Sequence, residues 1–212
     1  MLDIHLPHGK LHGIKDFFIH LLTITIGLFI ALSLEGWVES RHHHHLAQEA
    51  EDSLRVEIAN NAHEVVQQRQ MIKDDQKKLE ANLEVLEELR AHPHAKMGHI
   101  YLDLDLGGFD NMAWMNAQNT GSLAFMQYKD AQNFSDIYLE QDLFFKTVLN
   151  SLNDCGNANS LFISHPNDWV PSPAQVDMET DRIGKVKFDL MVLSSMAGQL
   201  DRIYQKFESE HK

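Results

Sequence analysis

The stretch FFIHLLTITIGLFIALSL, residues 17–34, decides the architecture of this chain. It lies between Asp16 and Glu35 and holds 18 residues without a single Asp, Glu, Lys or Arg. As an α-helix it covers about 27 Å of a hydrocarbon core that is about 30 Å thick. A buried helix of a globular protein normally shows a polar stripe, whereas only scattered His, Thr, Gly and Ser interrupt this run. The sequence therefore predicts a transmembrane helix over residues 17–38, with Trp37 at its far interface.

A cleaved signal peptide is the alternative interpretation of this stretch. Ala31 and Ser33 offer small residues at the spacing of a cleavage site, after an apolar run. The run is long for the apolar part of a signal peptide, so we favour an uncleaved anchor.

The basic residues that flank the span indicate its orientation. Lys10 and Lys15 precede it, and Arg41 is the only Lys or Arg in the fifteen residues after it. Because Lys and Arg concentrate on the cytoplasmic side, we expect residues 1–16 in the cytoplasm. Residues 39–212 then face the periplasm of a bacterium with two membranes.

Small residues recur at every fourth position of the span, at Thr23, Gly27 and Ala31. Lipid tails solvate leucine well, so helices in a membrane associate mainly where small residues let their backbones approach closely. Such stripes also arise by chance, and both readings stay open. If the face is used, the sequence predicts association with a second copy or with another membrane protein.

Composition excludes several classes of protein for the rest of the chain. The 212 residues hold 18 Lys and Arg against 31 Asp and Glu, which gives a formal net charge of −13. All of this net charge lies in residues 35–212, and such an acidic body argues against binding to nucleic acid. The single cysteine excludes an intramolecular disulfide and a multi-cysteine zinc site.

In the chain after the span, apolar residues recur at the spacing of an α-helix. Residues 46–90 contain no Gly or Pro and form one long amphipathic helix, either continuous with the span or separate from it. Its apolar residues at strict seven-residue spacing are Ile58, Val65, Ile72, Leu79 and Leu86. The companion heptad positions are polar: Asn61, Gln68, Asp75 and Asn82. A leucine zipper is therefore a poor match, and we expect the apolar stripe to pack against other helices of the same chain.

Shorter elements follow. Residues 99–106 alternate between apolar and polar and are expected to pack as an extended segment. Asp110 is expected to cap a short helix that ends near residue 119, with Gly121 in the left-handed position after it.

Two further long helices complete the predicted fold. One is expected over residues 128–152, followed by a loop over residues 153–173 that is rich in Asn and Pro. The last helix has apolar residues alternately three and four positions apart, from Ile183 to Phe207. The predicted fold class is all-α: a single transmembrane helix that leads into a long helix, packed with two further long helices and one short helix as a bundle.

Histidine is unusually frequent, with 14 residues. His42 and His45 share a helical face with Glu39 or Glu49 within a turn, which can offer imidazole and carboxylate ligands to a divalent transition metal such as zinc. A tolerated polar patch at the membrane surface explains the same residues without metal. A further group at the far end of the long helix consists of His92, His94 and His99.

The sequence predicts a protein without enzymatic activity. Asp154, Cys155 and His165 can be written as a nucleophile set, but no recognisable turn motif surrounds the cysteine, and no phosphate-binding loop or HExxH pair is present. We therefore expect no resident cofactor, unless the histidines bind metal.

Three stretches carry a family resemblance: TIGLFIALSLEGWVE at 25–39, AWMNAQNTGSLAFM at 113–126 and SDIYLEQ at 135–141. With its GxxIAL-type anchor, the chain resembles uncharacterised families of small bacterial single-pass inner-membrane proteins with a helical domain. The resemblance implies a bacterial inner membrane and brings no catalytic residue with it. The expected function is that of a membrane-anchored interaction or scaffold protein; the alternative is a metal-responsive or pH-responsive sensory module at His42–His45.

Overall fold

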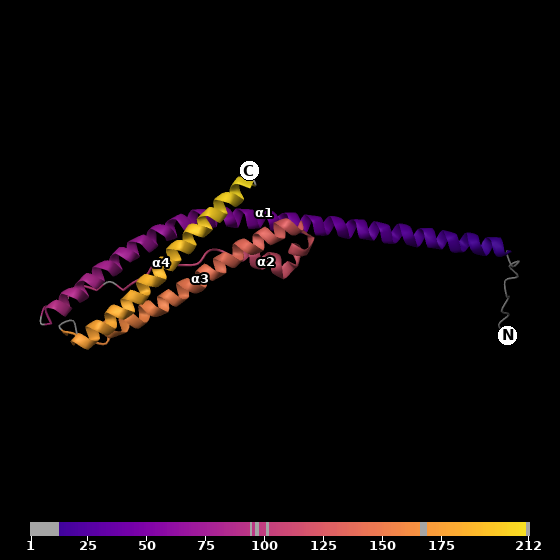
Figure 1. The fold of residues 1–212 in the computed structure, drawn as a ribbon. Coiled ribbons are helices and arrows are strands. Elements are labelled where there is room, and N and C mark those ends of the chain that lie inside the picture. Colours follow the sequence, from indigo (N-terminus) through magenta and orange to yellow (C-terminus); the bar gives the residue numbers. More distant parts are fainter. Residues whose placement is uncertain (1–12, 94, 96–97, 101, 166–168, 211–212) are drawn as a thin grey trace, which may run out of the picture.

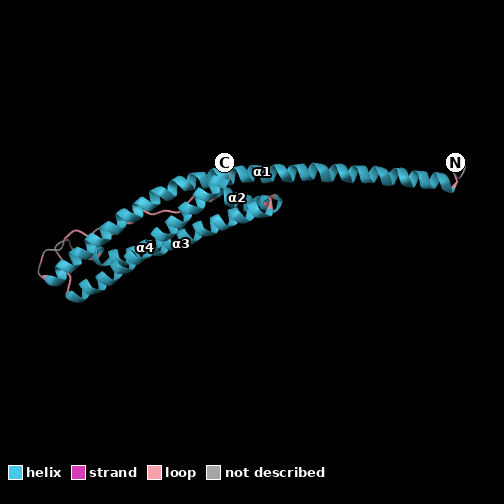
Figure 2. Cartoon of the chain, turned by 45° about the horizontal axis from the view of Figure 1, so that its top comes forward, coloured by secondary structure: helices cyan, strands magenta, loops and turns pink. Residues whose placement is uncertain are grey.

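The computed structural model describes residues 13–210, apart from residues 94, 96–97, 101 and 166–168. Over those residues the chain is all-α and contains no strand, as predicted (Figures 1 and 2). Its elements are the helices α1 (Ile14–Ala91), α2 (Met112–Thr120), α3 (Tyr128–Ile163) and α4 (Pro173–Glu210), with a 3-10 turn η1 (Ser122–Phe125) between α2 and α3. The 3-10 turn was not expected from the sequence.

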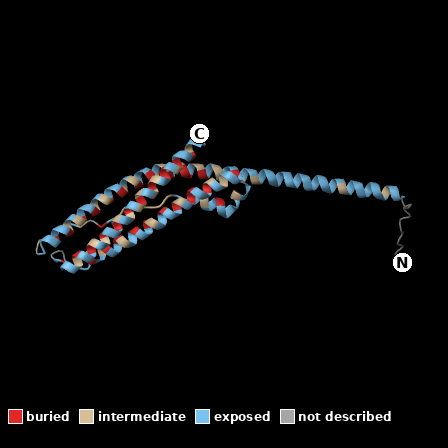
Figure 3. Ribbon diagram, viewed as in Figure 1, coloured by how far each residue is buried: buried red, intermediate tan, exposed pale blue. Residues whose placement is uncertain are grey.

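Helix α1 is continuous over 78 residues, so the apolar stretch and the long amphipathic helix form a single element about 115 Å long. Its N-terminal part, which contains the apolar stretch, projects from the rest of the molecule (Figure 1). Ala47 is the first buried residue of the helix, and buried positions then recur down to Leu89 (Figure 3). One helix thus contains both an exposed apolar segment and one side of the bundle core.

The bundle is arranged around α4, which packs against both α1 and α3. Few contacts join α1 directly to α3, because an extended segment, whose described residues are 99–100 and 102–111, runs along the bundle in contact with both (Figures 1 and 2). We call residues 99–111 the strap. It takes the place that a fourth helix has in a four-helix bundle.

Both heptad positions of α1 are buried in the bundle. The apolar position forms part of the core, and its five residues are at most 1% exposed. The polar position, which comprises Asn61, Gln68, Asp75 and Asn82, is at most 4% exposed. The prediction that the apolar stripe packs within the same chain is confirmed, and the polar residues beside it have a structural role.

The polar position of α1 forms hydrogen bonds with the backbone of the strap. The Asn61 side chain donates to the Asp110 carbonyl at 2.8 Å and accepts from the Asp110 amide at 3.1 Å. One heptad later, Gln68 Oε1 accepts from the Gly107 amide at 3.4 Å. Seven helical residues rise about 10.5 Å, and three extended residues span about 10 Å. One heptad of α1 therefore matches three residues of the strap in length. The strap therefore has a fixed register on α1.

The alternation predicted for residues 99–106 is also confirmed. Leu102 is buried, Ile100, Leu104 and Leu106 pack against the core, and the aspartates between them are exposed. On the side of α3, the Cys155 thiol donates to the Leu102 carbonyl at 3.2 Å. The strap is thus an amphipathic extended chain whose apolar side fills the groove between α1 and α3.

The start of α2 differs from the prediction. Asn111, not Asp110, is the N-cap residue, and it makes no side-chain capping bond. Glu57 of α1 supplies the acceptor instead: its Oε2 accepts from the Ala113 amide at 2.8 Å. The cap lies 56 residues away in sequence, so local capping rules could not find it. At the other end Gly121 is left-handed, with φ 70°, as predicted.

Helix α3 is longer than predicted, because residues 153–163 continue the helix where a loop was expected. The buried stripe of α3 continues through Ser151, Cys155, Ala158 and Leu161 at helical spacing. These residues are mostly small, and the strap packs closely there. Burial against the strap and α4 outweighs the low helix propensity of the Asn and Gly residues in this stretch.

Helix α4 agrees with the prediction for the last segment. Its apolar seam is buried at all eight positions, which are Ile183, Val186, Leu190, Leu193, Ala197, Leu200, Tyr204 and Phe207. Ion pairs along its edge join it to α1: Lys187 Nζ lies 3.1 Å from Glu80 Oε1, and Arg90 Nη2 lies 2.7 Å from Asp177 Oδ1.

The register of the strap can be tested by changing Asn61→Leu. This change removes the acceptor and the donor that Asp110 uses, and we expect the free energy of unfolding to fall by about 1–2 kcal/mol, measured by thermal unfolding of the full chain in detergent. The matched control is Asn60→Leu, at an exposed neighbouring position, which should leave the stability within about 0.5 kcal/mol. Equal effects of the two substitutions would contradict the assigned role of Asn61.

Candidate functional site

The apolar segment of α1 is the most prominent surface of the molecule. An 18-residue window of this helix is long and apolar enough to cross a membrane, and none of it is buried. A core helix of a globular protein would be covered by other elements, whereas this segment is bare along its whole length (Figure 3). The segment is compatible with a single membrane span.

The two threonine hydroxyls of this segment form hydrogen bonds within the helix. The hydroxyl groups of Thr23 and Thr25 donate to the carbonyls of Ile19 and Leu21, each at 2.8 Å. These bonds satisfy the hydroxyls within the helix, which is the low-cost arrangement where no water is available. The predicted association face is open, since a Cβ built on Gly27 would meet nothing within 4 Å.

Aromatic and basic side chains mark the end of the segment. The Arg41 guanidinium lies 5.0 Å from the centroid of the Trp37 ring, one turn back along the helix. An indole with a cation above it is typical of the boundary between lipid and water, where the ring stays in the apolar region and the charge remains hydrated. The predicted far interface near Trp37 thus has the side chains expected of one.

The histidines at 42–45 lie on α1 directly after Arg41. His43 stacks on Phe125 of the 3-10 turn, with ring centroids 3.8 Å apart and an interplanar angle of 10°. With Gly36 and Glu39, these two residues line a shallow groove of about 520 Å³. The contact joins the exposed part of α1 to the near end of the bundle, and sequence reasoning missed it because no pattern links positions 43 and 125.

The predicted metal ligands are only partly brought together. His45 Nε2 lies 3.7 Å from Glu49 Oε1, with both side chains about 70% exposed. Among the described residues, no group of three or more His, Cys, Asp or Glu side chains is arranged to hold a metal ion. One close pair, His45 and Glu49, thus forms within the predicted set of His42, His45, Glu39 and Glu49. All four side chains project outward from a single helix, so they do not converge on one point.

The described members of the second histidine group, His92 and His99, form no ligand cluster either. His92 Nδ1 lies 3.1 Å from Glu88 Oε1, one turn earlier on α1. His94 lies outside the described residues, and His99 is exposed at the start of the strap.

A buried polar centre lies inside the near end of the bundle. The Tyr138 hydroxyl donates to Glu57 Oε1 at 2.6 Å, while the other oxygen of Glu57 caps α2. The Trp114 ring stacks on Tyr138, with centroids 5.0 Å apart. Burial, together with the Glu57 carboxylate, raises the pKa of Tyr138 far above its usual range, so this hydroxyl stays protonated. The centre joins α1, α2 and α3.

The hypothetical nucleophile set is not assembled. Cys155 is buried and bonded to the strap, and burial raises the pKa of its thiol, which opposes thiolate formation. His165 follows the end of α3, where its Nδ1 lies 2.8 Å from the Leu161 carbonyl and its ring stacks on Trp169. The structure therefore does not place these two side chains as a nucleophile and its base.

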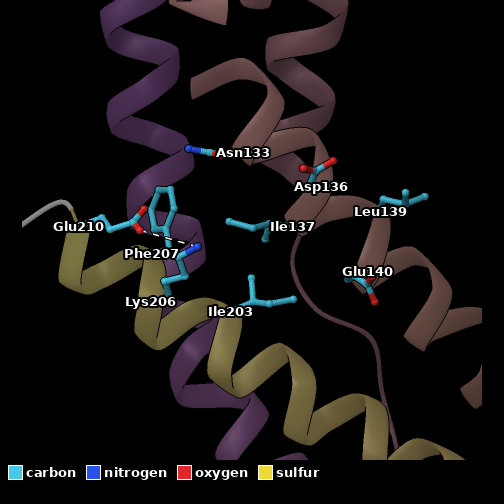
Figure 4. Close-up of a pocket in the computed structure, with 9 residues that line it drawn as sticks. All are labelled: Asn133, Asp136, Ile137, Leu139, Glu140, Ile203, Lys206, Phe207 and Glu210. Atoms are coloured by element: carbon cyan, nitrogen blue, oxygen red, sulfur yellow. Dashed lines mark ion pairs between the residues drawn. The ribbon is translucent and has the colours of Figure 1, made fainter. Parts of the chain in front are cut away.

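A groove of about 370 Å³ lies between the start of α3 and the end of α4 (Figure 4). Its floor is apolar, and its rim has more carboxylates than cations. The lining residues are Asn133, Asp136, Ile137, Leu139, Glu140, Ile203, Lys206, Phe207 and Glu210. Lys206 Nζ lies 3.8 Å from Glu210 Oε1, so the one lysine of the rim is already paired. Such a lining can accept hydrogen bonds from a polar or basic segment, and it contains no Ser, Cys or His.

Comparisons with protein-family models, with curated proteins and with solved structures found no match to this chain. The resemblance carried by residues 25–39 and 113–141 therefore stays a prediction.

One buried acid of α4 makes the stability of the bundle depend on pH. Glu179 is fully buried between the core residues Val176 and Ile183. Its burial raises the pKa of the carboxyl group to about 7, and the Arg182 guanidinium, 3.5 Å from Oε2, only partly opposes this.

We expect the bundle to lose stability as the pH rises from about 4.5 to about 7. In this window the unfolded chain releases the Glu179 proton first, which favours unfolding by up to about 3 kcal/mol in total. Glu179→Gln keeps the side chain neutral, so it should stabilise the protein at pH 8 and change little at pH 4.5, measured by thermal unfolding in detergent. Asp181→Asn, at an exposed position of the same helix, is the control and should have no such effect. If the stability of Glu179→Gln changed with pH in the same way as that of the unchanged protein, Glu179 would not be the group responsible for the pH dependence.

Proposed function

We propose that this protein is a non-enzymatic interaction or scaffold protein that a single transmembrane helix anchors in the bacterial inner membrane. The observation that carries the proposal is the continuity of α1, since one helix holds both a bare apolar segment of membrane length and a core face of the bundle. A bundle built onto its own anchor holds its surfaces at a fixed distance from the lipid. We assign residues 17–38 to the span and residues 39–212 to the periplasm.

In this proposal the acidic bundle is the part of the protein that binds partners. Its partners are the lipid bilayer and either a second copy or another membrane protein, and nucleic acid is not among them because the body is strongly acidic. The groove in Figure 4 combines an apolar floor with an acidic rim, which suits contact with a protein segment. No resident cofactor is part of the proposal.

Reporter fusions test the topology. Alkaline phosphatase, which is active only in the periplasm, should be active when fused after Lys212 and inactive when fused before Met1. A fluorescent protein that matures only in the cytoplasm should give the reverse pattern. The opposite result for both reporters would refute the orientation, and release of the chain by alkaline carbonate would refute the anchor itself.

The association face predicts the effect of added bulk in the span. Changing Gly27→Ile and Ala31→Ile together should reduce crosslinked oligomers in native membranes several-fold, because bulky side chains prevent close backbone approach. Ser33→Ile is the matched control: it also replaces a small residue, but it lies about 120° from Gly27 and about 160° from Ala31 around the helix. Unchanged crosslinking in the double variant would remove this face from the proposal.

A further inference from the structure

The 3-10 turn η1 and the first residue of α3 form the tip of the bundle nearest to the exposed part of α1 (Figures 1 and 2). Phe125, the last residue of the turn, stacks on His43 and lines one groove together with Gly36. The tip therefore reaches back along α1 to a level between Gly36 and His43.

This level coincides with the end of the apolar segment. The proposed span of residues 17–38 is about 33 Å long as a helix, close to the thickness of a hydrocarbon core. His43 lies about 7–8 Å further along α1 than residue 38, and the headgroup layer on each side of a bilayer is about 5–7 Å thick. A membrane crossed by α1 thus has its headgroups beside the tip.

The side chains at the tip are those that headgroup layers favour. Phe125 is 42% exposed even though it stacks on His43, and Tyr128 is 82% exposed. The apolar neighbours Leu123 and Met126 turn inward and pack against the core, so the two aromatic rings are the outward groups. Aromatic side chains are enriched at both interfaces of membrane proteins, where Tyr and Trp keep one end apolar and the other hydrated. Trp37 lies at the same level on α1.

We propose that this tip, formed by Phe125 and Tyr128, is a second membrane contact that docks on the lipid headgroup layer beside the span. The inference rests on the proposed function, because it needs α1 to cross the bilayer. Since α1 already holds the tip at headgroup height, docking requires no separate encounter with the membrane. Two points of contact then fix the tilt of the bundle, which a single straight helix would leave free.

The contact is aromatic and not electrostatic. The body has a net negative charge, so anionic lipid would repel it, and the binding surface is the zwitterionic headgroup layer. The proposal can therefore be tested in phosphatidylcholine alone.

The single native cysteine makes site-specific labelling straightforward. In a Cys155→Ser background, which keeps a donor for the Leu102 carbonyl, a fluorophore is attached at Phe125→Cys or Tyr128→Cys. The full chain is reconstituted in phosphatidylcholine nanodiscs at one chain per disc, with nitroxide-labelled lipids as quenchers at headgroup depth or deep in the acyl chains. Tyr128→Cys is the safer site, because this side chain is largely exposed.

Ile163→Cys is the matched control, since this apolar residue is 77% exposed at the far end of α3. We expect headgroup quenchers to reduce fluorescence at 125 and 128 at least threefold more than at 163. Leu28→Cys, in the middle of the span, should respond to the deep quencher. Quenching at 28 with equally weak quenching at 125, 128 and 163 would overturn the docking and leave the span intact. Absence of deep quenching at 28 would overturn both proposals.

Discussion

The fold depends on the hydrogen bonds that the polar heptad position of α1 forms with the backbone of the strap. An extended chain laid across a bundle brings peptide groups into a core, and buried peptide groups without partners are costly. Asn61 and Gln68 meet this need at two successive heptads. The match works because seven helical residues and three extended residues cover the same distance. A leucine at these positions would increase apolar burial and leave the strap without a register.

The position of the strap determines how the elements around it are placed. Its apolar side covers the groove between α1 and α3, and its end carries Phe109, which packs on Phe144 and Tyr204. The chain then enters α2, whose first turn is capped by Glu57 of α1, so the same helix positions both ends of this connection. The position of α2 places η1 against His43, beside the exposed half of α1. A constraint deep in the bundle thereby determines where η1 packs on α1.

Periodicity over a single element could be predicted from the sequence, whereas contacts between distant elements could not. The uncharged run lies in one helix, and the apolar heptad residues of α1 and the apolar seam of α4 are buried, as expected. Asn and Gly are poor helix formers and predict a loop over residues 153–163, yet burial of Cys155 and Ala158 against other elements decides the conformation of this stretch. The Glu57 cap and the stacking of His43 on Phe125 join residues 56 and 82 positions apart. No local signal reveals such pairs.

The use of α1 inside its own chain also limits how copies of the protein can associate. A long heptad helix next to a membrane often suggests a coiled-coil dimer, but here both heptad positions are covered by α4 and the strap. A second copy cannot pair with that seam unless the bundle opens. The surfaces that remain for association are the bare segment of α1, where Thr23, Gly27 and Ala31 are uncovered, and the outer face of the bundle. Association through the span would place two acidic bodies side by side, and their repulsion would favour splayed bundles over packed ones. The heptad seam of α1 is therefore not a surface through which copies of this protein could meet.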